Sequence, residues 1–233
     1  MNINDMYQIC QFAINKAQNG YLSPSQFNLI INQAQVSFQD YLLGEFQQYQ
    51  YGKGTPRVDY SLNETTRQRL APLIASANLT IDANGEADYP EDYSQTDSMR
   101  NPTTFDRIRY VEQDSLYSYY NSHIDPIATN PIYLLQPTGY QFYPKTLGTA
   151  KLTYVRTAPD MVWAYTLDVN NRPVYSPVGD TGVGITPTTG SVDPVWYDVD
   201  KLEIISRALK LIGVNLQTPL IEQYANQVTQ IGQ

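Results

Sequence analysis

The chain has 233 residues, with 15 Lys and Arg against 23 Asp and Glu and a net charge of −8, which opposes tight binding of nucleic acid. This length is enough for one large domain or two small ones, each with a real core. The single cysteine, Cys10, excludes an intramolecular disulfide and a zinc site made of cysteines, and we expect a buried structural thiol.

The N-terminal segment predicts two helices joined by a short turn. Apolar residues in Met6–Ala17 recur three and four residues apart, which places them on one face of a helix. Asn19-Gly20 favours the end of that helix, and Ser23-Pro24 then supplies an N-cap and a first helical position. A second apolar stripe follows over Phe27–Leu42, so an antiparallel helical hairpin is expected.

The second of these helices is unusual because its other face carries almost no charge. In NGYLSPSQFNLIINQAQ, residues 19–35, that face is rich in Asn and Gln. A solvent-exposed helix carries charged residues there by default. Uncharged polar residues suit a face that meets another protein, so this helix is a candidate for subunit contacts.

The middle of the chain changes to strand-like spacing. It begins with a loop over 47–61 and a weaker helix in ETTRQRLAPLIASA, interrupted by Pro72. Four segments rich in Tyr, Val, Ile and Thr then predict a small antiparallel sheet with proline-protected edges: 104–113, 131–144, 149–159 and 161–175. Asn170-Asn171 predicts a turn within the last of them.

Two segments predict long loops. Residues 82–97 carry six acids and no base, which predicts a solvated loop or an insertion that ends in a strand. Residues 178–193 are dense in Gly, Pro, Ser and Thr. Both lack enough apolar anchors to offset the entropy lost on ordering. We therefore expect both loops to be mobile in a free subunit and to be ordered by neighbouring proteins.

The C-terminal region has the strongest helical pattern. In DVDKLEIISRALKLIG, Asp198 or Asp200 provides the cap, Glu203 completes a capping box and Gly213 ends the helix. Thr218-Pro219 predicts a further helix. We expect these helices to pack with the N-terminal ones, burying Ile9, Ile14, Phe27, Ile31, Leu202, Ile205, Leu209 and Tyr224.

Together these segments predict an α+β fold: a helical bundle formed by the N- and C-terminal helices, with an inserted small antiparallel β region and long loops. The expected domains are an N-terminal helical part over 1–80, a β-rich insertion over 81–195 and C-terminal helices over 196–233. No apolar run approaches the roughly 20 residues of a membrane helix. MNINDMYQ lacks the features of a signal peptide, so we expect a soluble protein made in the cytoplasm.

No pattern predicts an enzyme, a metal site or a cofactor site. The single histidine, His123, lies between a serine and an aspartate, but neighbours in sequence do not give triad geometry. GDTGVGIT, from Gly179, lacks the lysine of a phosphate-binding loop. Asp82, Glu86 and Asp88 lack the spacing of an EF-hand. A carboxylate pair for glycoside hydrolysis stays open, although no spacing selects one.

Several motifs along the chain resemble one family. They are K-x-Q-x-G-Y-L-S-P-x-x-F-N with Q-A-Q over 16–35, Tyr89-Pro90 with Tyr93, and the turns Asp125-Pro126, Asn130-Pro131 and Tyr143-Pro144. The last is W-x-x-x-D-K-L-E-I-I with G-V-N-L over 196–216. Their order is similar to that in head–tail connector (adaptor or ring) proteins of short-tailed phages, especially crAss-like phages infecting Bacteroides.

The resemblance covers nearly the whole chain and implies a virion structural protein that is not an enzyme and binds no cofactor. Such proteins form a ring, usually twelve-fold, under the portal protein and join it to further tail or ring proteins. DNA passes the lumen without specific binding. Many known adaptors are almost entirely helical, so the predicted sheet leaves open which surface faces the portal and which the tail.

Candidate contact residues come from the uncharged helix and from the aromatic residues. The chain holds 20 tyrosines, and a tyrosine combines a large contact area with a polar tip. Ordinary exposure in a β region would explain them equally well. The candidates are Gln33, Gln35, Gln39, Tyr41, Tyr89, Tyr93, Trp196 and Tyr197.

An alternative function is a β-containing carbohydrate-binding or tail-fibre accessory module. In such a module Trp163, Trp196 and the tyrosines would be exposed platforms for sugars. Burial of both tryptophans in a core is the competing expectation. A hydrolase is a third class, supported only by the abundance of acids.

Overall fold

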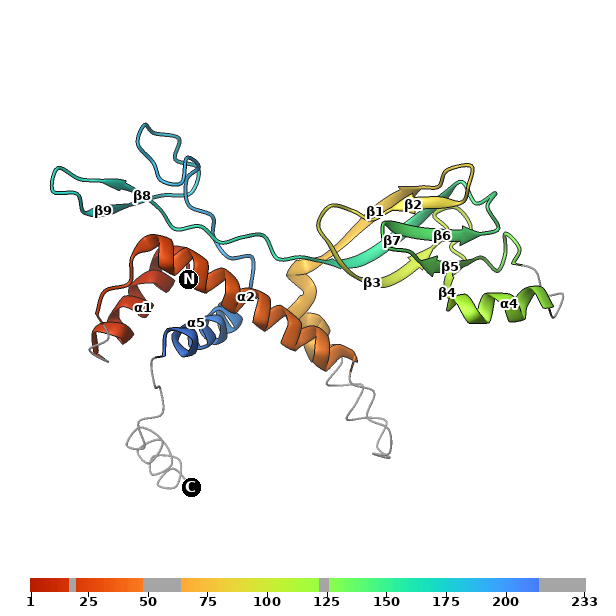
Figure 1. Cartoon of the computed structure of the whole chain (residues 1–233), viewed down its shortest axis with the longest axis horizontal. Helices are drawn as coiled ribbons and strands as arrows, with labels where there is room; N and C mark the ends of the chain where they lie inside the picture. The colour runs from red at the N-terminus through yellow and green to blue at the C-terminus, as the bar shows by residue number, and fades with distance from the viewer. Residues whose placement is uncertain (17–19, 48–63, 122–125, 214–233) are drawn as a thin grey trace, which may run out of the picture. The chain divides into compact units, whose positions relative to one another are not determined.

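The computed structural model describes residues 1–16, 20–47, 64–121 and 126–213, and the chain divides into two compact units (Figure 1). Unit 1 consists of Met1–Pro72 and Ala158–Gln233, and unit 2 of Leu73–Thr157. The chain therefore leaves unit 1, completes unit 2 and then returns to unit 1.

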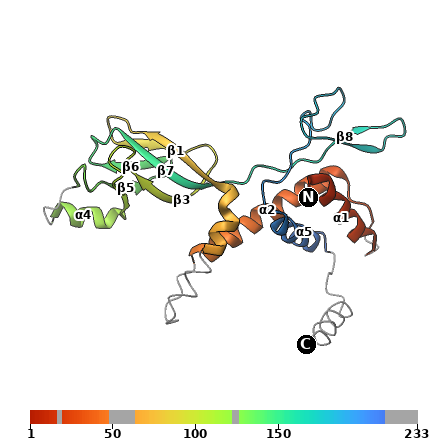
Figure 2. The same cartoon turned by 180° about the vertical axis from the view of Figure 1, so that it is seen from behind.

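Unit 1 is built on three helices whose apolar faces meet: α1 (Ile3–Lys16), α2 (Pro24–Gln47) and α5 (Asp198–Ile212). Helix α5 packs against both α1 and α2 (Figures 1 and 2). Residues 64–70 are also helical and lead into a 3-10 turn, η1 (Ala71–Leu73). Spacings of three and four place the buried residues on one side of each helix. They include Met6, Cys10, Ile14, Phe27, Ile31, Phe38, Ile205 and Leu209.

The ends of these helices follow local sequence rules with one exception. At α2, the Gln26 N–H donates to Ser23 Oγ at 3.4 Å and the Ser23 N–H donates to Gln26 Oε1 at 3.1 Å, which is a capping box. Gly213 ends α5 with a φ of 85°, as predicted. The predicted aspartate cap of α5 is wrong, because Tyr197 is the N-cap and makes no side-chain capping bond.

Unit 1 also contains a two-stranded antiparallel hairpin of β8 (Ala164–Leu167) and β9 (Pro173–Ser176) (Figure 1). The Asp168 carboxylate accepts the N–H groups of Asn170 and Arg172, each at 2.8 Å, and Asn171 has a φ of 58°. The predicted turn at Asn170-Asn171 is therefore confirmed. The following loop is joined to the hairpin by a bridge between Tyr165 and Thr186, and its mobility stays a prediction.

Unit 2 contains two sheets (Figure 1). The antiparallel three-stranded sheet has the order β1 (Ile74–Thr80), β7 (Thr149–Arg156), β3 (Tyr93–Arg100). The four-stranded sheet has the order β2 (Glu86–Asp88), β6 (Gly139–Tyr143), β5 (Ile132–Leu135), β4 (Arg109–Tyr110), in which the β4–β5 pair is parallel. Helix α4 (Gln113–Asn121) contributes Leu116 to a small cluster with Ile132 and Leu134.

The two sheets share one core. Alternation along the strands turns one side of each sheet inward. Tyr140 is nearly fully buried at the centre, and its hydroxyl lies 2.7 Å from Thr96 Oγ1. Strands β2 and β6 approach closely at Gly139, where a Cβ would lie 2.1 Å from the Ala87 carbonyl oxygen. The core comprises Leu79, Ile81, Ala87, Met99, Ile108, Tyr133, Tyr140, Phe142, Leu147, Ala150, Leu152 and Tyr154.

The predicted fold class is wrong. The described residues contain nine strands in three sheets, so the protein is a sheet-rich mixed α/β protein rather than a helical bundle with a small β region. Residues IASA of the predicted helix belong to β1. Residues 82–97, predicted as a loop or as an insertion ending in a strand, contain β2 and most of β3. In these strands Leu79 and Ala87 face the core between exposed polar neighbours. Such short period-two segments are easily hidden by small or acidic residues.

The predicted helical core is correct for five of its eight residues. Ile14, Phe27, Ile31, Ile205 and Leu209 are buried, and α1, α2 and α5 lie in the same unit. Ile9 and Leu202 are exposed, so their assignment to the core is wrong. Ile204 and Ala208 fill the core with Ile205 and Leu209, which turns Leu202 outward. Tyr224 and the predicted helix from Thr218 lie outside the described residues.

We predict that Leu209→Ala lowers the free energy of unfolding by about 2–5 kcal/mol, because it leaves a cavity in the core of unit 1. Leu209 is 4% exposed, whereas Leu202 on the same helix is 57% exposed. Leu202→Ala is the matched control and should change stability by no more than about 0.5 kcal/mol. Urea unfolding followed by circular dichroism measures both, and equal losses would contradict this packing.

Candidate functional site

The uncharged face of α2 binds an extended segment of the same chain. Four amides, Asn28, Asn32, Gln35 and Gln39, follow one another at spacings of four, three and four and therefore lie on one side of the helix. All four are hydrogen-bonded to the backbone of residues 158–163, where the chain re-enters unit 1. We call this set of contacts the amide ladder.

Two asparagines each hold one residue of the segment at both of its backbone groups. Asn32 donates to the Met161 carbonyl at 2.9 Å and accepts the Met161 N–H at 2.8 Å. Asn28 makes the same pair of bonds with Trp163, at 3.2 and 2.8 Å. A primary amide offers a donor and an acceptor side by side, so these side chains replace a neighbouring strand.

Two glutamines extend the ladder towards the start of the segment. Gln35 donates to the Pro159 carbonyl at 3.0 Å, and Gln39 accepts the Ala158 N–H at 3.1 Å. Gln35 is 1% exposed and also accepts the indole N–H of Trp196 at 3.2 Å. Both glutamines were candidate contact residues, and the structure places their amides on partners within unit 1.

Trp196 lies in an interior cluster between α2 and α5. It is buried, and its ring meets the Phe38 ring edge-on at 5.0 Å. Arg69 and Arg207 lie over the same Phe38 ring, with their guanidinium carbons 5.2 and 5.6 Å from its centre. Trp196, a candidate contact residue, therefore anchors the helices of unit 1 to one another.

Carboxylates beside this cluster are neutralised by arginine. Arg69 binds Asp200 at 2.7 Å and Glu203 at 2.8 Å, and Arg207 binds Glu203 at 2.9 Å. Burial acts to raise the pKa of Glu203, but the hydrogen bonds from Arg69 and Arg207 outweigh it and hold this pKa below its usual value. Glu203 thus serves the fold as a fixed anion.

Trp163 is also buried, so neither tryptophan offers an open platform for a sugar. The Trp163 ring lies tilted against the Tyr7 ring at 4.4 Å and stacks on the Tyr165 ring at 5.9 Å. Its indole N–H donates to Asn4 at 3.1 Å. A cavity of about 450 Å³ lies beside it, with Tyr21 among its lining residues. These positions match the competing expectation, in which both tryptophans belong to a core.

Tyr89 and Tyr93 belong to the aromatic cluster of unit 2. Their rings stack at 4.5 Å, and both meet Tyr140 edge-on. The Tyr89 hydroxyl donates to the Gln136 carbonyl at 2.9 Å, and the Tyr93 hydroxyl lies 2.9 Å from Thr96 Oγ1. Burial raises the pKa of Tyr89. Both residues are half-buried, so part of each side chain remains open for a partner.

The remaining candidates lie at the surface of unit 1. Gln33 lines a cavity of about 430 Å³ between α2 and α5, together with Arg207 and Leu211. Tyr41 is exposed on α2, and the Arg207 guanidinium lies 4.7 Å from its ring centre. Tyr197 is exposed directly before α5. The structure therefore divides the eight predicted contact residues into buried and surface groups.

The described residues contain no group of three or more His, Cys, Asp or Glu that could bind a metal ion. The Asp82 carboxylate accepts the N–H groups of Glu86 and Asn84, which lower its pKa within a local turn. The predicted turn at His123 lies outside the described residues. In the part of the chain that is described, every helix is too short or too polar to span a membrane.

The sequence matches no protein-family model, and no curated protein aligns with it as a relative. The resemblance to phage connectors thus stays a prediction. A function for this chain is therefore inferred from its own exposed surfaces.

The sequence prediction missed the partner of the amide ladder. The signal was present, because Asn and Gln repeat on one face of α2 with helical spacing. Such a face binds backbone groups equally well within a chain or between chains. The segment that it binds lies 119 to 135 residues further along, beyond the range of local patterns.

We predict that Asn32→Ala lowers the free energy of unfolding by about 2–4 kcal/mol, because it leaves both backbone groups of the buried Met161 without partners. Gln33→Ala, one residue along on the exposed side of α2, is the control and should be close to neutral. Thermal unfolding gives the stability of each variant. Amide hydrogen exchange at Met161 and Trp163 should rise only in Asn32→Ala, and unchanged exchange there would contradict the ladder.

A further prediction concerns Cys10, which is fully buried; burial raises the pKa of its thiol to about 12. The folded protein retains this proton where the unfolded chain loses it, at a pKa of about 8.5. The contribution of the Cys10 proton to the free energy of unfolding is therefore fully present below about pH 8.5 and is lost as the pH rises towards 12. At pH 8 the native thiol should react with Ellman's reagent only as fast as the chain unfolds. Rapid native reaction would contradict this burial.

Proposed function

We propose that this protein is a virion structural subunit of the head-to-tail connector ring of a short-tailed, crAss-like phage. In this proposal it has no catalytic role and needs no cofactor. Copies of the chain form a closed, twelve-fold ring that joins the portal protein to further tail or ring proteins, and DNA passes through its lumen. The observation that supports it best is the presence of exposed apolar side chains on two unlike surfaces of unit 1.

The first of these is the helical surface, formed by Leu29, Gln33 and Val36 of α2 with Leu211 of α5. Leu29, Val36 and Leu211 are exposed, and Gln33 and Leu211 line the same cavity. The spacing 29, 33, 36 places the three α2 residues on the side of the helix away from its buried stripe. Adjacent exposed apolar residues with an uncharged amide between them are typical of a protein contact surface.

The second is the hairpin surface, formed by Leu167, Val169 and Val174 of the β8–β9 hairpin with Val183 of the following loop. All four are exposed, and Val169 is 98% exposed. The hairpin and the loop project away from the helices of unit 1 (Figures 1 and 2). Aliphatic side chains at the tip of a projection gain little from their own fold, so contact with another protein would stabilise them.

A ring requires two unlike surfaces on each subunit. In a heterologous contact, one side of a subunit binds the opposite side of the next, and the rotation closes the set. The helical surface and the hairpin surface differ in shape and meet this requirement. Tyr41 and Tyr197, exposed on or beside the helices, combine apolar area with a polar tip and suit the rim of such a contact.

We predict that Leu29→Glu with Val36→Glu breaks the ring without unfolding the subunit, because the charges would have to be buried at the contact. Gln8→Glu with Asn15→Glu, two exposed positions on α1, adds the same charge elsewhere and should leave the ring closed. Native mass spectrometry and negative-stain imaging measure the assembly. Rings in both variants, or a wild-type protein that stays monomeric even with the portal protein, would contradict the proposal.

The biological role has its own test in the phage. Deletion of the gene should give filled heads that leak DNA or lack tails, because the portal would have no partner below it. Complementation with the wild-type gene is the control. Normal infectious particles after the deletion would overturn the assignment.

A further inference from the structure

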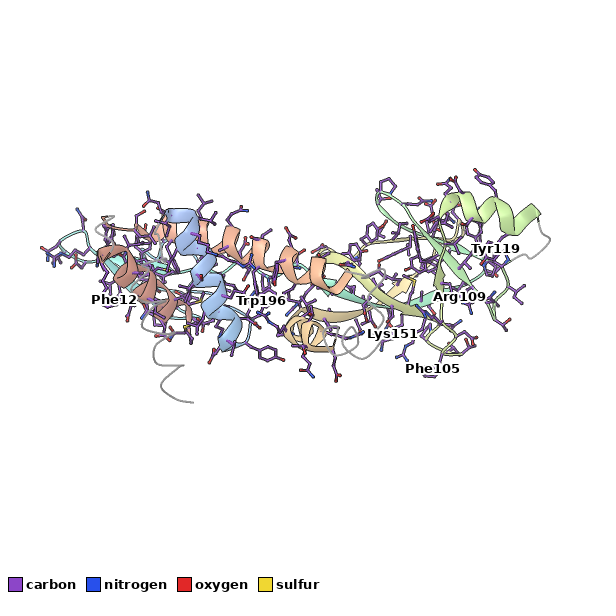
Figure 3. All side chains as sticks on the ribbon, turned by 90° about the horizontal axis from the view of Figure 1, so that it is seen from below. Phe12, Phe105, Arg109, Tyr119, Lys151 and Trp196 are labelled. Carbon is purple, nitrogen blue, oxygen red and sulfur yellow. The ribbon has the colours of Figure 1, made fainter. Side chains whose placement is uncertain are left out.

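A row of cations runs from the outer face of the three-stranded sheet in unit 2 to β4 of the four-stranded sheet. Lys151 of β7 pairs with Arg100 of β3, and Arg100 is bridged in turn to Arg107. Arg109 follows two residues later, with the buried Ile108 between the two arginines, so strand alternation turns both arginines outward. We call these four residues the cation row, and Figure 3 labels two of them, Arg109 and Lys151.

The cation row is electrostatically unfavourable in the chain as it stands. Residues opposite each other on adjacent strands have Cβ atoms about 4.5–5.5 Å apart, and like charges there destabilise a sheet. None of the four cations forms an ion pair with any residue that the structure describes. Arg107 and Arg109 line a cavity of about 540 Å³ that includes one acid, Asp106. An anionic ligand would relieve this repulsion.

The surroundings of the cation row offer neutral donors. The positions facing Lys151 and its neighbours across β1 and β7 carry hydroxyl or amide groups, and none of them is an acid. They are Ser76, Asn78, Thr80, Thr149 and Thr153. Hydroxyl and amide groups, together with Lys and Arg, make most of the contacts that proteins form with phosphate and sugar.

An aromatic side chain stands beside the row. Phe105 is 66% exposed, and the Arg100 guanidinium lies 5.1 Å from its ring centre. Its φ of 62° is a left-handed conformation that a residue with a bulky side chain rarely adopts. Tyr110, next to Arg109, is also exposed. Exposed rings beside cations are the pattern by which proteins stack the bases of single strands.

We infer that this face binds the phosphodiester backbone of nucleic acid, with the cation row on the phosphates and Phe105 or Tyr110 against a base. The planar guanidinium of an arginine can bind a phosphate through two parallel hydrogen bonds. Three of the four cations in the row are arginines. Within the proposed function the ligand is the genome passing through the connector. Only the choice of DNA rests on that function, because the site itself lies within one subunit.

The expected binding is weak for each copy. Four phosphate contacts give a slope of log Kobs against log salt of about −3 to −4. The remaining acids of the chain are screened beyond about 8 Å at physiological ionic strength, so the row acts locally despite the net charge of −8. Several copies around a lumen would add their contacts. Weak single contacts of this kind allow DNA to move while it is guided.

An acidic surface on a second copy of the chain is the competing occupant, since the protein is itself acidic. The exposed rings and the surrounding hydroxyl groups favour nucleic acid, because an acidic protein surface would have no use for a base-stacking group. The experiment therefore measures both DNA binding and self-association on the same samples.

Fluorescence anisotropy of a labelled oligothymidylate, titrated with the full chain at low and at moderate salt, tests the inference. The triple variant Arg100→Gln, Arg107→Gln, Lys151→Gln should lose affinity at least tenfold, and its salt slope on this single strand should become shallower by about two. The matched control Lys16→Gln, Lys145→Gln, Arg172→Gln removes three exposed cations elsewhere and should keep the slope. Phe105→Ala should weaken binding while leaving the slope unchanged.

Two further measurements separate binding from folding and from assembly. The triple variant should unfold at the same temperature as the wild type or higher, because it relieves like-charge repulsion. The unfolding temperature thus distinguishes a loss of affinity caused by unfolding from one caused by removal of the cations. Three results would overturn the inference. The wild type could show no salt-dependent binding of the oligonucleotide, or the control variant could lose as much affinity as the triple variant. The triple variant could also lose self-association while its DNA affinity stays unchanged. Rings without DNA binding would leave the proposed function standing, and DNA binding without rings would leave the site standing.

Discussion

The architecture of unit 1 depends on how the chain is held when it returns from unit 2. Residues 158–163 are extended, and Val162 forms an antiparallel bridge with Val192. The buried backbone N–H and C=O groups of its neighbours need other hydrogen-bond partners. The amides of α2 provide them, with two bonds each to Met161 and Trp163. The β8–β9 hairpin, Trp196 and α5 all follow this segment in the chain. Their positions relative to α1 and α2 therefore depend on the ladder.

The same constraint explains why α2 has an uncharged face. Lysine and arginine can only donate hydrogen bonds, and an ionised carboxylate can only accept them, whereas a primary amide does both. A charged residue at Asn32 would leave one backbone group of Met161 unpaired and would itself be desolvated. Gln35 adds a third function, since it also holds the Trp196 indole. Part of the pattern that predicted contacts between chains is thus used within one chain.

The sequence predicts those features that depend on neighbours in the chain. The stripe containing Phe27 and Ile31, the Ser23 cap of α2, and the turn at Asn170-Asn171 each require only residues a few positions apart. The sequence did not predict long-range pairing, because the partner of Asn28 lies 135 residues away. The burial of the predicted contact residues was hard to predict for the same reason. Helical spacing separates Gln35 from Gln33 on α2, but it does not show that Gln35 is covered by a segment 124 residues further along.

The distribution of charge shows why composition is a poor guide to partners in this protein. Arg69, Lys201 and Arg207 in unit 1 are all engaged by carboxylates, so they add nothing to an external field. Three residues of the cation row lie within ten positions of one another, and the fourth, Lys151, joins them only through the register of β3 and β7. The bridge from Arg100 to Arg107 completes the row. The net charge of −8 sets the electrostatic field far from the chain. A ligand bound at the surface interacts only with the unpaired charges within about one Debye length of it. Apolar surfaces on unit 1 and an unpaired cationic face on unit 2 therefore fit different partners, a protein and a polyanion.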